Sequence, residues 1–188
     1  MKIDIYNPPR KYSVIYADPP WAYKHQGGRG TALAHYGTMG TDDIAALPVR
    51  TICTDNALLF MWATFPNIEE AIKVMRGWGF EYKTAAFVWV KTNKKSGSPF
   101  WGMGAYTRAN AEVCLLGVSK KTKAGEQIKD HGVHQIITAP IEIHSKKPDI
   151  TRERIERLTG SEGGYVELFA RQSSPGWDIW GNEAPEEA

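Results

Sequence analysis

The segment from Tyr12 to Trp21 (YSVIYADPPW) constrains the fold of this chain more than any other stretch. It begins with an apolar, β-branched run that is typical of a buried strand. The run ends abruptly in one acid, two prolines and an indole. Pro19 biases Asp18 toward extended backbone, and two successive prolines fix φ twice while removing two N–H donors. The sequence therefore predicts a stiff rim of acceptors, the Asp18 carboxylate and neighbouring carbonyls, beside a flat aromatic ring. Such a rim suits a planar ligand that carries an amino group.

Composition limits the class of protein. A chain of 188 residues suits one α/β domain and is short for two, so we expect residues 1–188 to form a single domain. A formal net charge of +2 leaves any nucleic-acid binding to local patches, while seven tryptophans and eight tyrosines suggest that some aromatic rings face a ligand. Neither a signal peptide nor an apolar run near ~18 residues is visible, and Cys53 and Cys114 lack metal or redox spacing. We expect a cytoplasmic protein with buried free thiols and no membrane association.

The rest of the chain alternates between strand-like and helix-like segments. We expect strands at 56–63, 82–91, 112–118, 135–139, 165–170 and 177–180, and helices from Thr41 to Pro48, at 67–76 and at 149–158. Asn67 and Glu70 fit a capping box, and Ile150 belongs to the predicted inner face of the last helix. Strand, helix and strand at this spacing predict a right-handed βαβ unit and a largely parallel sheet.

Two loops have functional composition. Residues 22–36 are glycine-rich and follow the carboxyl end of the first strand, where open α/β sheets bind ligands, so we expect an active-site lid. Residues 92–110 form the longest irregular segment and interleave basic with aromatic residues. This composition can grip a phosphate backbone while stacking on bases, and we interpret the segment as a nucleic-acid or partner loop.

Further motifs follow the corner at Asp18 in a fixed order: HYGTM at 35–39, WGF at 78–80, VWVK at 88–91, KPD at 147–149, ELFAR at 167–171 and GNE at 181–183. The ordered set resembles the DPPW-type adenine-N6 methyltransferases, the family of the eukaryotic messenger-RNA adenine methylation enzyme and of many bacterial and phage proteins. The resemblance covers nearly the whole chain. It implies an α/β, Rossmann-like methyltransferase fold with permuted motif order, a mostly parallel twisted sheet flanked by helices, and S-adenosylmethionine as cofactor.

The resemblance also implies roles for individual residues. The catalytic set is Asp18, Pro19, Pro20 and Trp21. The carboxylate of Asp18 and the carbonyl of Pro19 would accept hydrogen bonds from the adenine amine, and Trp21 would stack on the base. The cofactor-binding set is Asp4, Ile5, Asp18, Lys147, Glu167, Arg171, Asn182 and Glu183. Lys147 would pair with the methionine carboxylate, although a solvated lysine, or a surface ion pair at Arg171, is the structural alternative.

Tyr36 and Lys91 are the further candidates for binding the target base or strand, with a core tyrosine and a strand-end lysine as alternatives. Trp62, Trp89 and Trp180 are assigned to the core, and no spacing supports a metal site, so we expect none. We expect the substrate to be DNA, with RNA as the alternative. The alternative from a different functional class is a family member without catalytic activity that binds nucleic acid or a partner subunit. The sequence leaves open whether the protein forms a homodimer or joins a partner subunit.

Overall fold

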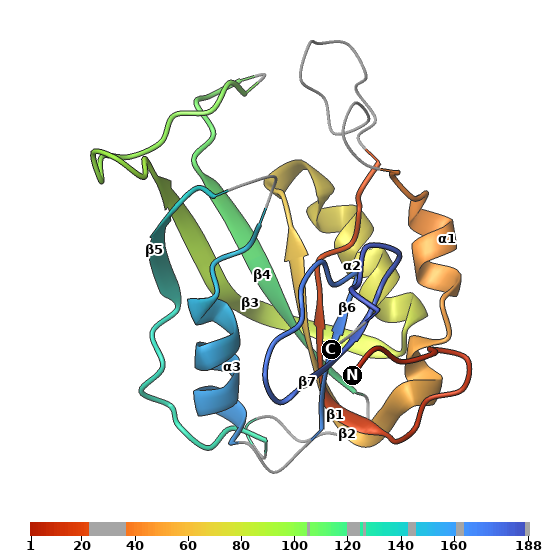
Figure 1. Ribbon diagram of the computed structural model, residues 1–188. Helices are drawn as coiled ribbons and strands as arrows, with labels where there is room; N and C mark the ends of the chain where they lie inside the picture. Colours follow the sequence, from red (N-terminus) through yellow and green to blue (C-terminus); the bar gives the residue numbers. More distant parts are fainter. Residues whose placement is uncertain are drawn as a thin grey trace.

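A seven-stranded sheet forms the centre of the protein, with strand order β5-β3-β4-β2-β1-β6-β7 (Figure 1). The computed structural model describes residues 1–22, 37–104, 106–119, 125, 127–142, 146–160 and 164–186. Its strands are β1 (Tyr12–Ala17), β2 (Cys53–Ala63), β3 (Phe80–Thr92), β4 (Ala111–Ser119), β5 (Ile136–Pro140), β6 (Tyr165–Leu168) and β7 (Trp177–Trp180). Its α-helices are α1 (Thr41–Ala46), α2 (Ile68–Gly77) and α3 (Ile150–Thr159), and short 3-10 turns span Val49–Ile52 and Phe65–Asn67.

The strand directions confirm a mostly parallel sheet. β1 runs parallel to β2 and β6, β6 to β7, and β3 to β5, whereas β4 lies antiparallel between β2 and β3. The carboxyl ends of the parallel strands and the amino end of β4 therefore meet at one edge of the sheet. Open α/β sheets bind their ligands at this edge.

The two faces of the sheet bury separate hydrophobic clusters, because side chains alternate between faces along each strand. On β1, Ile15 and Ala17 face the cluster that contains residues of α1 and α2, while Val14 and Tyr16 face the cluster that contains Ile155 of α3. Figure 1 shows α1 and α2 together on one side of the sheet and α3 on the other. The molecule is thus a three-layer α/β/α arrangement, as expected for a Rossmann-like fold.

Two local expectations are wrong. Asn67 precedes α2 but makes no side-chain capping hydrogen bond, because the 3-10 turn at Phe65–Asn67 leads directly into the helix and Ile68 N–H bonds to the Phe65 carbonyl. Ile150 is 40% exposed rather than buried, since it lies in the first turn of α3, whose buried residues are Thr151, Arg152, Ile155 and Thr159.

Smaller differences concern element ends and cysteines. α1 begins at Thr41 with Gly40 in the cap position, and β6 ends at Leu168, two residues earlier than expected. Cys53 and Cys114 are buried and free, as the sequence predicts. Within the described residues, no helix is both long and apolar enough to cross a membrane. The predicted lid comprises residues 22–36. Of these, only Ala22 belongs to the described part of the chain.

Candidate active site

The corner at Asp18 lies at the carboxyl end of β1, between β2 and β6. Backbone contacts fix its shape. The Trp21 N–H donates to the Pro19 carbonyl at 2.9 Å, and the Met39 N–H donates to the Pro20 carbonyl at 3.0 Å. The Trp21 indole Nε1 donates to the carbonyl of Trp62 on β2 at 3.0 Å, and the ring is only 7% exposed. Trp21 therefore anchors the corner to the neighbouring strand.

A chain of alternating charges starts at Asp18. Lys147 Nζ donates to Asp18 Oδ2 at 2.9 Å and lies 3.3 Å from Glu112 Oε2. Glu112 Oε1 in turn accepts from Lys91 Nζ at 2.5 Å. The four side chains are between 10% and 21% exposed, so their interactions are much less screened than those of surface pairs. Lys147 is therefore not a solvated lysine, whereas Lys91 is the strand-end lysine of the alternative interpretation, paired with Glu112.

The direction of β4 explains why the sequence does not predict Glu112 as a residue of the site. Glu112 is the second residue of β4 and pairs with Trp89 near the carboxyl end of β3. Because β4 is antiparallel to its neighbours, its amino end reaches the edge where the other strands have their carboxyl ends. The residue pattern at 112–118 predicts a strand, but the direction of that strand in the sheet depends on which strands it pairs with.

Burial and neighbouring charges set the pKa values of these groups. Burial raises the pKa of Asp18 above its ordinary value, and this outweighs the opposing effect of the Lys147 ammonium. Burial alone would raise the pKa of Glu112, but Lys147 and Lys91 together lower it. For Lys147, burial opposes the charged form, yet Asp18 and Glu112 raise its pKa, so the ammonium is retained. A cation held between two carboxylates is the electrostatic centre of the site.

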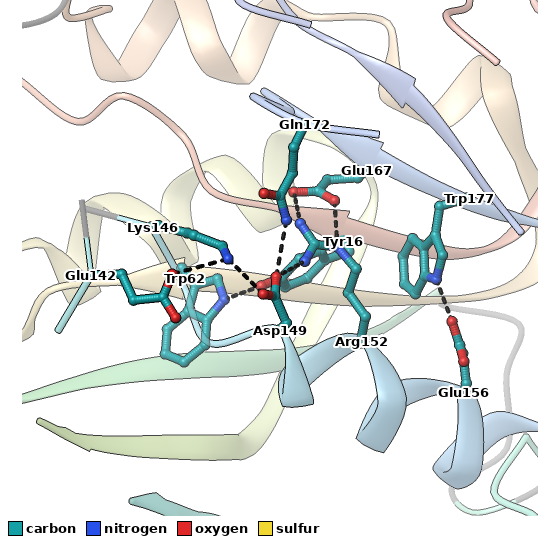
Figure 2. Close-up of polar contacts among 10 residues, drawn as sticks. All are labelled: Tyr16, Trp62, Glu142, Lys146, Asp149, Arg152, Glu156, Glu167, Gln172 and Trp177. Carbon is teal, nitrogen blue, oxygen red and sulfur yellow. Dashed lines mark hydrogen bonds and ion pairs between the residues drawn. The ribbon is translucent and has the colours of Figure 1, made fainter. Parts of the chain in front are cut away.

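Glu167 lies on β6 beside β1 and is held by a residue that the sequence does not single out. Arg152 of α3 binds it bidentately, with Nε 2.8 Å from Oε2 and Nη2 2.9 Å from Oε1 (Figure 2). The guanidinium carbon of Arg152 also lies 5.6 Å from the ring centroid of Tyr16, whose hydroxyl accepts from Trp62 Nε1 at 2.6 Å. Glu167, one of the expected cofactor-binding residues, is therefore fixed in a buried ion pair.

Asp149, just before α3, collects a second set of polar contacts (Figure 2). Its Oδ1 accepts from Arg152 Nη1 at 3.1 Å and from Gln172 Nε2 at 2.9 Å, and its Oδ2 accepts from Lys146 Nζ at 2.5 Å. These bonds tie the start of α3, and with it Lys147, to the segment that follows β6. Gln172 is a further residue that sequence reasoning left unassigned, because its partner is distant in the chain.

The carboxyl ends of β6 and β7 are held close together. A Cβ added to Gly181 would lie 2.9 Å from the Cα of Phe169, so only glycine fits there, and Phe169 itself has φ of 61°. Arg171 Nε lies 3.6 Å from Glu183 Oε2, and Glu183 and Asn182 are exposed. This pairing brings the ELFAR and GNE motifs to one edge.

The N-terminal segment runs beside β7, where Lys2 forms a parallel bridge with Ile179. Asp4 is exposed and its Oδ1 accepts from the Tyr6 N–H at 2.9 Å, whereas Ile5 is fully buried. Of the predicted site residues, Tyr36 alone lies outside the described part of the chain.

The charged and polar side chains at this edge of the sheet suit the expected cofactor, S-adenosylmethionine. An ammonium that is 10% exposed, at Lys147, can bind a carboxylate. The carboxylates of Glu167 and Glu183 can accept hydrogen bonds from hydroxyl and amino groups. Strands β1, β6 and β7 are neighbours, so these groups border one continuous stretch of the sheet edge.

Comparison with known proteins finds relatives that match over most of the chain. A sequence profile of the MT-A70 family matches residues 12–183. The chain is 36% identical over 197 residues to the type II methyltransferase M.MunI of Mycoplasma sp, an alignment that covers 95% of this chain and 80% of the relative. It is 31% identical over 176 residues to the human N(6)-adenosine-methyltransferase catalytic subunit METTL3, covering 92% of this chain and 28% of the relative. It is 29% identical over 188 residues to the human N(6)-adenine-specific methyltransferase METTL4, covering 93% of this chain and 38% of the relative.

Proposed function

The chain belongs to the MT-A70 family of methyltransferases, and on that premise we propose that it methylates the exocyclic amine of adenine in nucleic acid, with S-adenosylmethionine as methyl donor. The observation that carries the proposal is the corner at the end of β1. There the Asp18 carboxylate accepts a hydrogen bond from the buried Lys147 ammonium, and the Pro19 carbonyl, which accepts one hydrogen bond from the Trp21 N–H, keeps a second lone pair. The names of METTL3 and METTL4 support N6 of adenine as the acceptor atom.

An adenine amine is a poor nucleophile because its lone pair is delocalised into the ring. The Asp18 carboxylate and the Pro19 carbonyl would accept hydrogen bonds from its two N–H groups and favour the pyramidal nitrogen. When bound, S-adenosylmethionine would supply a methyl group activated by the adjacent sulfonium. Asp18 is suited to receive the proton that the nitrogen loses, since burial has raised its pKa. In-line positioning can contribute roughly 7–11 kcal/mol without a covalent enzyme intermediate.

In this proposal the remaining residues hold the two reactants. Lys147 would bind the methionine carboxylate through its buried ammonium, which also contacts Asp18 and Glu112. Glu167, Arg171, Asn182 and Glu183 would contact the ribose and adenine of the cofactor, and Asp4 with Ile5 would border its adenine. Arg152 would act by holding the Glu167 carboxylate in place.

The target base would lie against the corner. Trp21 is 7% exposed and bonded to β2, so it would form the floor of the base site rather than an open stacking platform. Tyr36 and Lys91 are the additional base or strand contacts that we propose, with residues 22–36 as a lid.

We favour DNA over RNA as the substrate. The chain is more similar to the type II methyltransferase, at 36% identity, than to METTL3, at 31% identity. The alignment also covers 80% of the type II methyltransferase but only 28% of METTL3. RNA is the second candidate, which the N(6)-adenosine relatives support. The two buried free thiols fit a reducing compartment, so we place the protein in the cytoplasm.

Transfer of a labelled methyl group to chemically matched oligonucleotides tests the proposed acceptor. One strand carries adenine, and its control carries purine, which lacks the exocyclic amine, at the same positions. The proposal expects label in the adenine strand alone. Equal labelling of both strands would show that another atom is methylated.

A further inference from the structure

The described residues of the connection between β3 and β4, 93–104 and 106–110, fold back as an arm at the site edge of the sheet. In a first turn, the Asn93 N–H donates to the Ser98 carbonyl and the Gly97 N–H to the Asn93 carbonyl, each at 2.9 Å. A second turn is closed by paired hydrogen bonds between Gly102 and Ala109 at 2.8 and 3.1 Å. We call residues 93–104 and 106–110 the β3–β4 arm. Figure 1 shows it extending beyond the carboxyl ends of the parallel strands.

The arm is rooted on a residue of the active site. Phe100 N–H donates to the Lys91 carbonyl at 2.9 Å, and Lys91 N–H donates to the Asn110 carbonyl at 2.8 Å. Lys91 Nζ pairs with Glu112, which lies 3.3 Å from Lys147. A strand bound along the arm would therefore lead toward the corner at Asp18.

The arm exposes apolar side chains that the core does not use. Tyr106 is fully exposed, Met103 is 83% exposed and Trp101 is 59% exposed. Elsewhere in the described chain the exposed aromatic rings lie singly, at Tyr6, Phe65 and Tyr82. Two exposed aromatic rings and an exposed methionine on one short segment are unusual on a surface that no ligand covers.

The positive charge of the arm indicates which kind of ligand it could bind. It contains Lys94, Lys95 and Arg108 and no acidic residue. Both lysines and the arginine are exposed. Cations and flat aromatic rings exposed on the same segment match a polyanion whose own flat groups are accessible.

Resting on the proposed function, we propose that the β3–β4 arm binds an unpaired stretch of the substrate nucleic acid next to the target adenine. Trp101 and Tyr106 stack on exposed bases, while Lys94, Lys95 and Arg108 neutralise phosphates. The strand must be unpaired because the faces of bases inside a duplex are covered by their neighbours. Single-stranded or locally opened nucleic acid is thus the substrate form that the arm selects.

The size of the effect follows from known interactions. Base–aromatic stacking corresponds to about a 5- to 150-fold change in affinity for each ring lost. Each phosphate contact on a single strand contributes about 0.7 to the slope of log affinity against log salt concentration.

Fluorescence anisotropy with a labelled single-stranded oligonucleotide and its duplex tests the proposal. Trp101→Ala and Tyr106→Ala should each weaken single-strand binding at least about 5-fold, with cofactor affinity in calorimetry unchanged. The double variant Lys94→Gln/Lys95→Gln should reduce the salt slope by about 1.4. The matched controls are Tyr82→Ala and Lys83→Gln near the opposite end of β3, which should leave both quantities unchanged.

Two outcomes would overturn the proposal: unchanged single-strand affinity in the arm variants, or tighter binding of the duplex than of the single strand. Unchanged affinity together with a lower sedimentation coefficient in the variants would assign the arm to contact between two copies of the chain. If the arm variants weaken binding but the parent protein methylates neither DNA nor RNA, the arm proposal holds and the proposed function fails.

Discussion

Asp18 combines two properties that a solvent-exposed aspartate lacks: a raised pKa and a fixed position at the end of β1. Both come from burial between neighbouring strands, with Lys147 as the nearest counter-charge. A carboxylate in this setting can orient an amine. Because its pKa is raised, it is also a stronger base than an ordinary aspartate and accepts a proton more readily.

Asp18→Asn should reduce kcat for methyl transfer by about 10²- to 10³-fold, because an amide replaces a positioned, charged acceptor. Cofactor affinity, followed by calorimetry, should change much less than kcat. The matched control is Asp42→Asn, since Asp42 is 86% exposed in its pair with Lys73 on the surface. Full activity in Asp18→Asn would remove this residue from the mechanism.

The buried pair of Arg152 and Glu167 gives a stability prediction. Arg152→Met leaves the Glu167 carboxylate unpaired at 8% side-chain exposure, and should lower the free energy of unfolding by about 3–5 kcal/mol. Arg157→Met on the same helix removes a pair whose arginine is 64% exposed, and should cost less than about 1 kcal/mol. Urea denaturation measures both, and equal losses would contradict the role assigned to Arg152.

At the scale of elements, β4 determines which side chains share the site. Being antiparallel, it delivers Glu112 to the edge occupied by Asp18 and Lys147. The sequence itself marks the corner at Asp18 by its acid, prolines and indole, whereas Lys147 is implied only by the family resemblance; the structure places the two side chains in contact. Glu112 and Arg152 could not be found, since one depends on strand direction and the other on which face α3 turns toward β6.

Glu112→Gln should shift the acid limb of the pH–rate profile to lower pH. The active form of Asp18 is the carboxylate, which is lost as the pH falls through its raised pKa. Glu112 contributes to raising that pKa, so removing its charge lowers the pKa and extends activity toward acid.

The control for this shift is Glu142→Gln, because Glu142 pairs with Lys146 at 43% side-chain exposure. Its acid limb should stay in place. A limb that moves to higher pH in Glu112→Gln would contradict the electrostatic description of the site.

At the scale of the whole molecule, the fold joins two halves of a site that are far apart in the sequence. Asp18 lies near the start of the chain, and Lys147, Glu167 and Arg171 lie near its end. The parallel pairing of β1 with β6 brings them to one edge. The alternation of strands and helices predicts a largely parallel sheet, and the family resemblance of the ordered motifs implies the Rossmann-like fold. Whether residues 1–188 fold as one independent domain stays a prediction, and so do the roles of the individual site residues.

Mass spectrometry of nucleosides tests the central claim most directly. DNA and RNA of the same sequence are incubated with the protein and isotopically labelled S-adenosylmethionine, digested and analysed. We predict labelled N6-methyladenine, with more in DNA than in RNA, and its loss with Asp18→Asn. Label on cytosine, or no labelled base in either nucleic acid, would contradict the account.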